Sequence, residues 1–224
     1  MVKLSLPLIF ENDHLFLEVA GRLWVFDTGA PTSFGETEEL TLLDETFRFS
    51  ANFMGLTAPM LSRYLQVECA GLLGMDILAR FDHLMDIPGQ TITISSAELS
   101  HPGDPVALEY ISGVPVVTAN IMETDYRMFF DTGAQLSYFQ DDSLTDFPKA
   151  GSVTDFHPGY GPFETDLFDV DLTLGSETFI LSCGRLPEPL GMGILKVGVH
   201  GVIGNPILVN RVTGFFPRRD ILYL

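Results

Sequence analysis

Short apolar runs separated by turn residues follow one another along the whole chain. Turn signals recur every eight to twelve residues or so, and the runs between them are rich in Val, Ile, Leu and Phe. Residues 4–10, 15–19 and 23–26 are three such runs, and polar or glycine-containing turns divide them. This spacing is typical of an all-β protein. Helical signals are few and short, and we expect single turns at residues 75–80 and 205–209 and an acidic helical stretch at 36–40.

An internal repeat divides the chain into two halves. Residues 23–30 (LWVFDTGA) match residues 127–134 (RMFFDTGA), at a shift of 104 positions. Residues 71–78 (GLLGMDIL) match residues 201–208 (GVIGNPIL), at a shift of 130 positions. A repeated plan of this kind predicts two lobes, at residues 1–103 and 104–224, joined through the turn-rich stretch 100–105.

Each DTGA motif follows an apolar run that we expect to be a buried strand. Such a strand delivers the aspartate to a turn, where the threonine supplies a hydroxyl and the glycine lets another backbone come close. One Asp-Thr-Gly often marks only a turn at the end of a strand. Two copies, each followed by a glycine-containing apolar run, make Asp27 and Asp131 a candidate catalytic pair.

These residues resemble the pepsin and retropepsin aspartic peptidases. The resemblance rests on the two DTGA motifs and on the downstream patterns Leu72-Leu73-Gly74 and Val202-Ile203-Gly204. It is closest to the retropepsins, because Ala30 and Ala134 stand where pepsin-like enzymes usually carry serine. It implies an all-β fold of two acid-protease lobes, closed-barrel-like and related by a pseudo-two-fold axis, with a few short helices. The active site would lie in the cleft between them.

The resemblance also implies a function, that of an aspartic endopeptidase that needs no cofactor and no metal. Asp27 and Asp131 would share one proton, and the ionised member would activate a water that attacks the peptide carbonyl. The sequence does not assign the proton to either aspartate. Thr28 and Thr132 would each clasp the opposite lobe beneath the pair. Gly29 and Gly133 would allow the close backbone approach.

The alanines bear on the pH at which such an enzyme would work. In pepsin-like enzymes, the serine after DTG donates a hydrogen bond to a catalytic carboxylate and helps to keep it ionised. Alanine removes this donor, and a formal net charge of −18 further disfavours ionised carboxylates. We therefore expect a weakly acidic optimum.

The two halves differ in the length between the aspartate and the glycine motif. Asp27 and Gly71 are 44 positions apart, whereas Asp131 and Gly201 are 70 apart. Family members carry a β-hairpin flap in this interval. We predict one full flap, from the second half, with strands at 153–156 and 164–170 and Tyr160 or Phe163 at its tip over the cleft. A further hairpin is expected from residues 169–174 and 178–181, and the first half has only residues 46–68 for a flap.

The ends of each half predict how the lobes join. Strands at 2–6, 91–95, 105–108 and 221–224 would form the junction, so one chain would hold a complete site and act as a monomer. Pocket walls are expected near Pro31, Phe34, Gln135 and Tyr138, and their apolar character suggests hydrophobic side chains beside the scissile bond.

The charge and composition of the chain limit the classes of partner that we expect. The acidic charge would repel a nucleic acid backbone, and no apolar stretch reaches the length of a membrane span. The N-terminus does not resemble a signal peptide, so we interpret Cys69 and Cys183 as separate reduced thiols in a cytoplasmic protein. The five histidines lack the paired spacing of zinc ligands. The expected partner is a peptide or protein substrate.

A second function class stays open. The same fold could persist as a peptide-binding or interaction module with weak or no turnover, because a fold alone does not define an activity.

Overall fold

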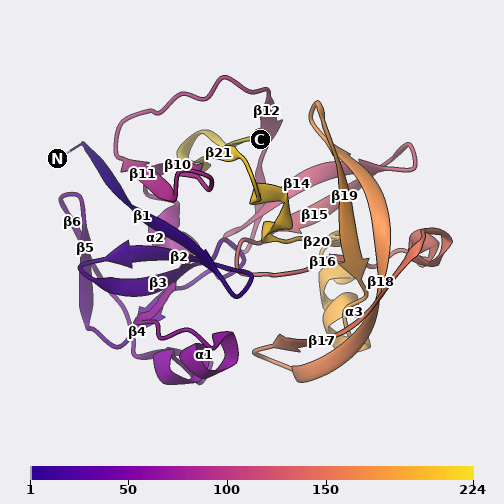
Figure 1. The fold of residues 1–224 in the computed structure, drawn as a ribbon, viewed down its shortest axis with the longest axis horizontal. Coiled ribbons are helices and arrows are strands. Elements are labelled where there is room, and N and C mark those ends of the chain that lie inside the picture. The colour runs from indigo at the N-terminus through magenta and orange to yellow at the C-terminus, as the bar shows by residue number, and fades with distance from the viewer. Residues whose placement is uncertain (1) are drawn as a thin grey trace.

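The computed structural model describes residues 2–224, which form two β lobes lying side by side (Figure 1). The first half contributes β1 (Lys3–Glu11), β2 (His14–Val19), β3 (Arg22–Phe26), β4 (Phe34–Gly35), β5 (Glu39–Leu42), β6 (Glu45–Arg48), β7 (Asn52–Phe53), β8 (Leu56–Thr57), α1 (Ala58–Leu65), β9 (Gly71–Leu73), α2 (Met75–Leu78), β10 (Asp82–Asp86) and β11 (Thr91–Ser95).

The second half begins with β12 (Pro105–Ala107), β13 (Glu109–Ile111), β14 (Val114–Ile121), β15 (Thr124–Phe130), β16 (Ser137–Phe139), η1 (Asp142–Asp146), β17 (Lys149–His157) and β18 (Gly161–Leu174). It ends with β19 (Glu177–Gly184), α3 (Glu188–Lys196), β20 (Gly201–Ile203), η2 (Asn205–Leu208), β21 (Val212–Phe216), η3 (Pro217–Arg219) and β22 (Ile221–Tyr223). The predicted all-β fold with a few short helices is confirmed. No helix of the described residues is long and apolar enough to cross a membrane.

The same strand arrangement holds each DTGA motif. In the first lobe, β3 runs parallel to β9, which pairs antiparallel with β4. In the second lobe, β15 runs parallel to β20, which pairs antiparallel with β16. The backbone N–H of Asp27 donates to Leu73 O at 3.0 Å, and that of Asp131 donates to Ile203 O at 2.9 Å. The repeat seen in the sequence is thus a repeat of structure, with each aspartate placed just beyond the end of a central strand.

The lobes join through a ten-stranded sheet in the order β12-β22-β21-β10-β11-β1-β2-β3-β9-β4. The four strands expected at the junction all lie in this sheet. However, the pair that crosses between the halves is β10 with β21, and the sequence did not indicate it. In this pair Leu84 lies opposite Gly214, its own equivalent at the shift of 130 positions. The pseudo-two-fold axis therefore passes between these two strands.

Strand β10 was missed because it begins with two polar residues that the fold buries. Asp82 is fully buried and accepts hydrogen bonds from Arg218, Arg219 and Leu99 N. Paired arginines offset the cost of burying its carboxylate. Because the arginines follow β21, this cluster ties the two halves together beside the shared sheet.

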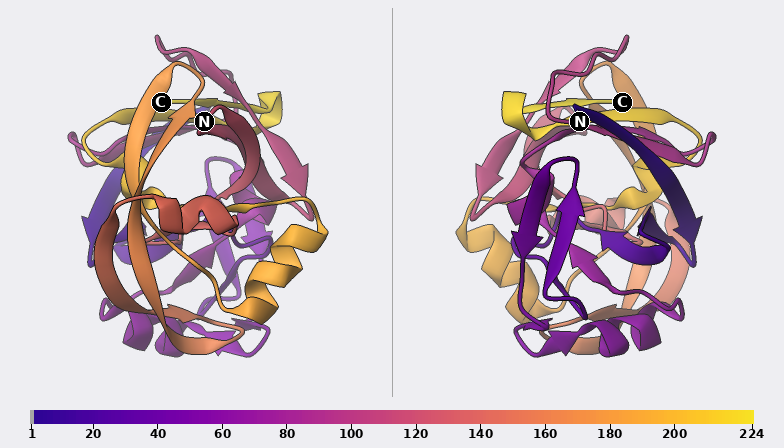
Figure 2. Two further views of the ribbon diagram at one scale, coloured as in Figure 1. Left: turned by 90° about the vertical axis from the view of Figure 1, so that its right-hand side faces the viewer. Right: turned by 90° about the vertical axis from the view of Figure 1, so that its left-hand side faces the viewer.

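The helical expectations were partly wrong. Single turns form at α2 and η2, but residues 36–40 are no helix and lead into β5. Helices α1 and α3 were missed, and both carry a proline in the first turn, where a helix tolerates it. Figure 2 shows α3 on one flank of the second lobe and the β18–β19 hairpin on the other.

The core spans both lobes, and a smaller apolar cluster lies beneath α1. Phe34 belongs to the smaller cluster and is only 1% exposed, so it is not available as a pocket wall. Cys69 and Cys183 are both free and buried.

Candidate active site

Asp27 and Asp131 meet where the two lobes face each other. Each follows a strand whose last residue, Phe26 or Phe130, is fully buried. The two carboxyl groups share a hydrogen bond. Backbone donors also reach them, because Ala30 N donates to Asp27 Oδ1 at 2.9 Å. The structure thus brings together two carboxyls that are 104 positions apart in the sequence.

The two threonines form a reciprocal set of hydrogen bonds beneath the aspartates. Thr28 Oγ1 donates to Phe130 O at 2.7 Å, and Thr132 Oγ1 donates to Phe26 O at 2.6 Å. Each hydroxyl also accepts the backbone N–H of the other threonine at 3.0 Å. Both side chains are fully buried. Every bond crosses between the lobes, so the threonines fix the position of one aspartate relative to the other.

The glycines keep this space open. A Cβ atom on Gly29 would overlap the carboxylate of Asp131, and one on Gly133 would lie 2.5 Å from Asp27 Cγ. No side chain fits at either position without displacing a carboxylate. The glycine of each lobe therefore leaves the space that the aspartate of the other lobe occupies.

The two carboxyls differ in their surroundings. Burial raises the pKa of Asp27 well above its ordinary value and the negative charge of Asp131 raises it further, while the N–H groups of Ala30 and Gly29 lower it. Burial also raises the pKa of Asp131, but the N–H groups of Gly133 and Ala134 and the hydrogen bond from Asp27 lower it. Asp131 Oδ1 accepts these two N–H groups at 2.9 and 3.2 Å. The pair therefore holds a single proton over a window of pH, and its titration belongs to both carboxyls together.

A long hairpin of the second lobe reaches over the inter-lobe region. Strands β17 and β18 pair from His157–Gly161 at the tip back to Lys149–Phe168. Near the tip, Asp155 accepts hydrogen bonds from the Tyr138 hydroxyl and, at 2.9 Å, from Gln135 Nε2. The flap hairpin predicted from the longer second interval does form. Strand β18 continues into the second expected hairpin by pairing with β19.

The two predicted flap residues lie at or near the tip, beside a cavity of about 840 Å³. The lining of this cavity comes from the second lobe and includes neither Asp27 nor Asp131, so a place for these two residues over the carboxyl pair stays a prediction. Tyr160 is in the turn and is 50% exposed, and Phe163 lies 6.2 Å from it, ring centroid to ring centroid. Arg185 and Pro187 line the other side of the cavity. Phe163 also packs near Tyr138, with ring centroids 6.2 Å apart.

The first lobe has no hairpin of this length in the described interval 46–68. It forms instead the two-residue strands β7 and β8, followed by α1. The first lobe thus presents a helix where the second presents a flap.

Comparison with known proteins agrees with this architecture. An aspartic proteinase from Irpex lacteus matches with a TM-score of 0.53 and 11% sequence identity, over 98% of this chain and 96% of that one. The chain has the pepsin-like fold. No family model and no curated protein matches the sequence. At this identity the match shows the fold alone.

Within the pepsin-like fold, the two glycine motifs hold the loops that follow the aspartates. Met75 N donates to Ala30 O at 2.8 Å, and Asn205 N donates to Ala134 O at 2.9 Å. Ser33 Oγ accepts Gly74 N at 2.8 Å, and Ser137 Oγ accepts Gly204 N at 3.1 Å. The serines are therefore matched structural residues of the repeat.

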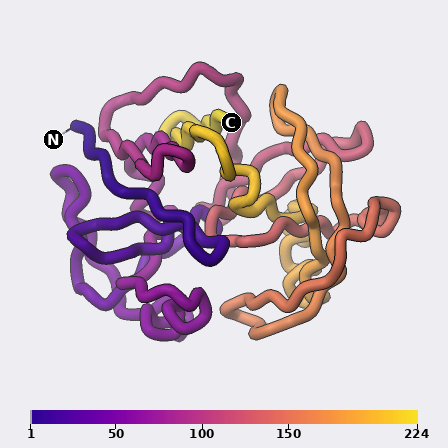
Figure 3. The backbone as a smooth tube through the Cα atoms, viewed as in Figure 1, coloured from indigo at the N-terminus to yellow at the C-terminus, as the bar shows by residue number. Residues whose placement is uncertain are grey.

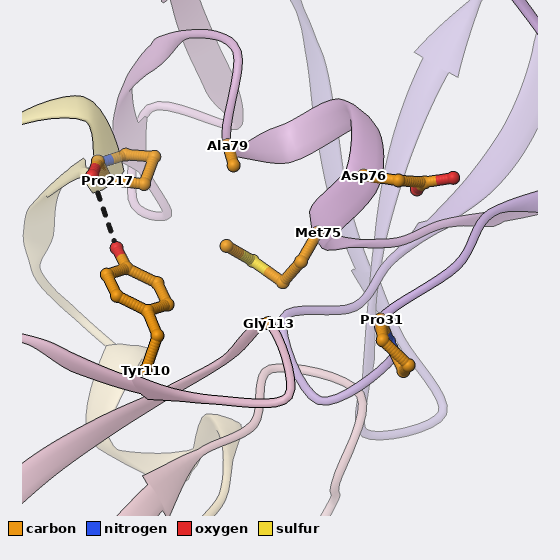
Figure 4. A pocket seen from close by; sticks show the side chains of 7 residues that line it. All are labelled: Pro31, Met75, Asp76, Ala79, Tyr110, Gly113 and Pro217. Carbon is orange, nitrogen blue, oxygen red and sulfur yellow. Dashed lines mark hydrogen bonds between the residues drawn. The ribbon is translucent and has the colours of Figure 1, made fainter.

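The matched positions Met75 and Asn205 differ in what they contact. Asn205 Nδ2 donates to Asp13 O at 2.8 Å and to Thr132 O at 3.2 Å, which binds the β1–β2 turn to the second lobe. Met75 has no amide group that could bind the other lobe in this way. Its side chain lines a cavity of about 310 Å³ between the lobes (Figure 4). The cavity is lined by Pro31, Met75, Asp76, Ala79, Tyr110, Gly113 and Pro217. The predicted wall residue Pro31 thus borders a hollow between the lobes.

The described residues contain no group of three or more His, Cys, Asp or Glu side chains that could hold a metal ion.

Sequence reasoning missed Asp155 and Phe156 on the flap. The alternation of β17 could have shown that they face opposite sides, but their partners come from other elements and leave no local signal.

Proposed function

We propose that this protein is an aspartic endopeptidase that hydrolyses peptide bonds with water activated between Asp27 and Asp131. The proposal rests on one observation, the hydrogen-bonded carboxyl pair held by matched contacts from both lobes. Two neighbouring carboxyls that share one proton can act as an acid and a base at once. All six residues of the two Asp-Thr-Gly motifs take part in this arrangement.

The different surroundings of the carboxyls support an assignment of roles. Asp131 is assigned as the base, because the hydrogen bond within the pair lowers its pKa while raising that of Asp27. Backbone N–H groups stabilise the ionised form of both carboxyls. Asp131 takes a proton from the water as the water attacks the peptide carbonyl. Asp27 holds the proton and donates it to the developing oxyanion. The leaving nitrogen is then protonated, and the carboxyl pair returns to its starting state.

The finer family assignment belongs to this proposal as well. Alanine after each DTG favours a retropepsin-like enzyme, with two such lobes fused in one chain. Because each half supplies one aspartate, a single copy would be sufficient for activity. The substrate would be an extended peptide segment beneath the β17–β18 flap, and the aromatic rings of Tyr160 and Phe163 favour apolar side chains near the scissile bond.

The test is cleavage of a diverse peptide library, followed by mass spectrometry, over a range of pH. Wild type should cleave, and Asp27→Asn and Asp131→Asn should each lower the rate by about 10³-fold, within the range usual for loss of a general acid or base. Asp171→Asn is the matched control, because Asp171 is an exposed aspartate on β18. Equal cleavage by wild type and Asp27→Asn would refute the mechanism. Peptide binding by wild type without cleavage at any pH would instead support an interaction module.

A further inference from the structure

One aromatic contact joins the lobes on the side of the molecule opposite the shared sheet. The rings of Tyr64 and Phe156 are stacked, with centroids 3.9 Å apart and planes inclined by 26°. Tyr64 lies in α1 of the first lobe, and Phe156 is the next-to-last residue of β17 in the flap. The turn between β17 and β18 lies beside α1 in Figures 1 and 3. The flap of one lobe therefore rests on the helix of the other.

The residues on either side of Phe156 connect this contact to the candidate active site. Asp155 accepts hydrogen bonds from Tyr138 and Gln135, which follow Asp131 by a few positions. His157 lies near enough to Asp131 for its charge to lower the pKa of that carboxyl. Since neighbouring side chains of a strand point to opposite faces, Asp155 and His157 share one face of β17 while Phe156 occupies the other. A segment of three residues thus contacts the second lobe, lies near the carboxyl pair and reaches the first lobe.

Helix α1 is a firm support for such a contact. Leu61 is buried in the smaller core cluster. Ser62 Oγ donates to Ala58 O at 2.9 Å and accepts Cys69 N at 3.0 Å. Asn12 Nδ2 donates to the carbonyl of the last helical residue at 3.2 Å. The helix is therefore bound to the body of its lobe from several sides.

Tyr64 itself contributes little to that support. Its side chain is 42% exposed, and within the described part of the chain its hydroxyl makes no hydrogen bond. The ring is the part of Tyr64 that meets another lobe. Helix α1 lies between the aspartate and the glycine motif of the first lobe, the interval in which the second lobe carries its flap. The first lobe therefore presents a helix for the flap to contact, in place of a flap of its own.

We propose that Tyr64 is a positioning residue of the peptidase, the docking point that holds the second-lobe flap closed over the carboxyl pair. The inference rests on the proposed function. Substrate entry and product release separate Tyr64 from Phe156, and closure restores the stack. The stacked rings then keep residues 155–157 against the bound peptide, so that one flap and one helix together cover the site.

The first experiment compares peptide cleavage by Tyr64→Ala, Tyr64→Phe and Met60→Ala. Loss of an aromatic pair of this kind corresponds to about a threefold to tenfold change. We expect Tyr64→Ala to raise KM by this factor with little change in kcat, because the flap would contribute to binding in the ground state and the transition state alike. Tyr64→Phe should restore the wild-type value, since only the ring is needed. Met60, equally on α1 and 36% exposed, should be neutral.

Equal KM values for Tyr64→Ala and Met60→Ala would overturn the proposal. So would a Tyr64→Phe variant as impaired as Tyr64→Ala.

The second experiment detects docking without relying on activity. The double variant Tyr64→Cys/Phe156→Cys is treated with the thiol cross-linker dibromobimane, which fluoresces once both of its ends have reacted. Burial raises the pKa of Cys69 and Cys183, so the native thiols should react slowly. We expect efficient cross-linking and loss of cleavage of a folded protein substrate. Each single cysteine variant, treated in the same way, should remain active.

Cross-linking no more efficient than in the distant pair Tyr64→Cys/Ile180→Cys would overturn the proposal, and so would unchanged cleavage after cross-linking. If the proposed function is wrong, wild type cleaves no peptide. The cross-linking yield still reports whether the flap docks on α1, so the two failures can be told apart.

Discussion

The two lobes hold the same motif in the same way, but they cover it differently. Strands β3 and β15, the threonine hydroxyls and the glycine motifs are matched bond for bond across the pseudo-two-fold axis. Above the motif the match ends, because the second lobe extends the β17–β18 flap and the first lobe offers helix α1. Symmetry is kept where the two carboxyls must be placed relative to each other. It is lost where a peptide would be covered.

The comparison extends to the carboxyls. Backbone N–H groups reach both Asp27 and Asp131, but the hydrogen bond shared by the pair lowers the pKa of Asp131 while raising that of Asp27. The unequal roles proposed for the two aspartates rest on this difference.

Alanine at either motif glycine should abolish most activity. Gly29→Ala would push a methyl group into Asp131, and Gly133→Ala would push one into Asp27. Since a displacement of about 1 Å at a catalytic group costs on the order of 10²-fold, we expect kcat to fall by at least that factor in both variants. Gly193→Ala in α3 is the control, because nothing lies within 4 Å of a Cβ there. A wild-type rate in either motif variant would mean that the carboxyl pair is not the site.

Removal of one threonine hydroxyl should destabilise the whole molecule. Thr28→Val leaves Phe130 O and Thr132 N without these partners in the buried region between the lobes, and Thr132→Val does the same in the mirrored sense. We expect a loss of about 2–4 kcal/mol in the free energy of unfolding for each variant. Urea denaturation measures it, with Thr118→Val, at an exposed threonine of β14, as the control. A loss in only one of the two would show that the reciprocal bonds are energetically unequal.

Acid should weaken the junction of the lobes through His83. Burial lowers the pKa of His83 to about 4, although its bond to Leu78 O and the charge of Asp82 oppose the shift and Arg218 adds to it. The unfolded chain therefore binds this proton first, and stability is lost as pH falls from 6.5 toward 4. The loss amounts to about 3 kcal/mol at most.

The measurement for His83 is the free energy of unfolding of wild type and His83→Gln at several pH values from 7 to 4. The difference between the two proteins should decrease by that amount as the pH falls. A difference independent of pH would contradict the role of His83. The matched position in the second half is Thr213, which carries no titratable group, so this acid sensitivity should come from the first lobe alone.

The alanines after the two aspartates should control the pH optimum. We expect wild type to work best at weakly acidic pH, and a pH–rate profile that peaks below about pH 3 would contradict this. Ala30→Ser or Ala134→Ser supplies a hydroxyl that stabilises an ionised carboxylate. The acidic limb of the pH–rate profile should therefore move to lower pH, by about one unit at most. Ala79→Ser is the control. A shift in the opposite direction would mean that the added hydroxyl bonds the protonated form instead.

The sequence predicted those parts of the fold that repeat or alternate. The DTGA motifs, the glycine motifs and the hairpins carry their own local signals, and the protein has the all-β, two-lobed architecture that they indicate. The β10–β21 junction was not predicted because Asp82 and His83 are polar residues that a local pattern places at the surface. Both are buried in the folded protein, where Arg218 and Arg219 bind the Asp82 carboxylate. Helix α1 was missed because its eight residues make only about two turns and include a proline, although Ala58, Leu61 and Leu65 recur at helical spacing. Contacts between distant elements, such as Tyr64 with Phe156, leave no trace in a local pattern.

Two ordinary aspartates become one proton-sharing pair when the two lobes meet. Carboxyl ¹³C NMR titration of Asp27, in wild type and in Asp131→Asn, is the decisive measurement of this pairing. We predict that Asp27 in wild type keeps its proton well above the usual pH range of an aspartate, and that its pKa falls in the variant as the neighbouring charge is removed. An Asp27 that titrates in the usual range, unchanged by the substitution at position 131, would contradict the account.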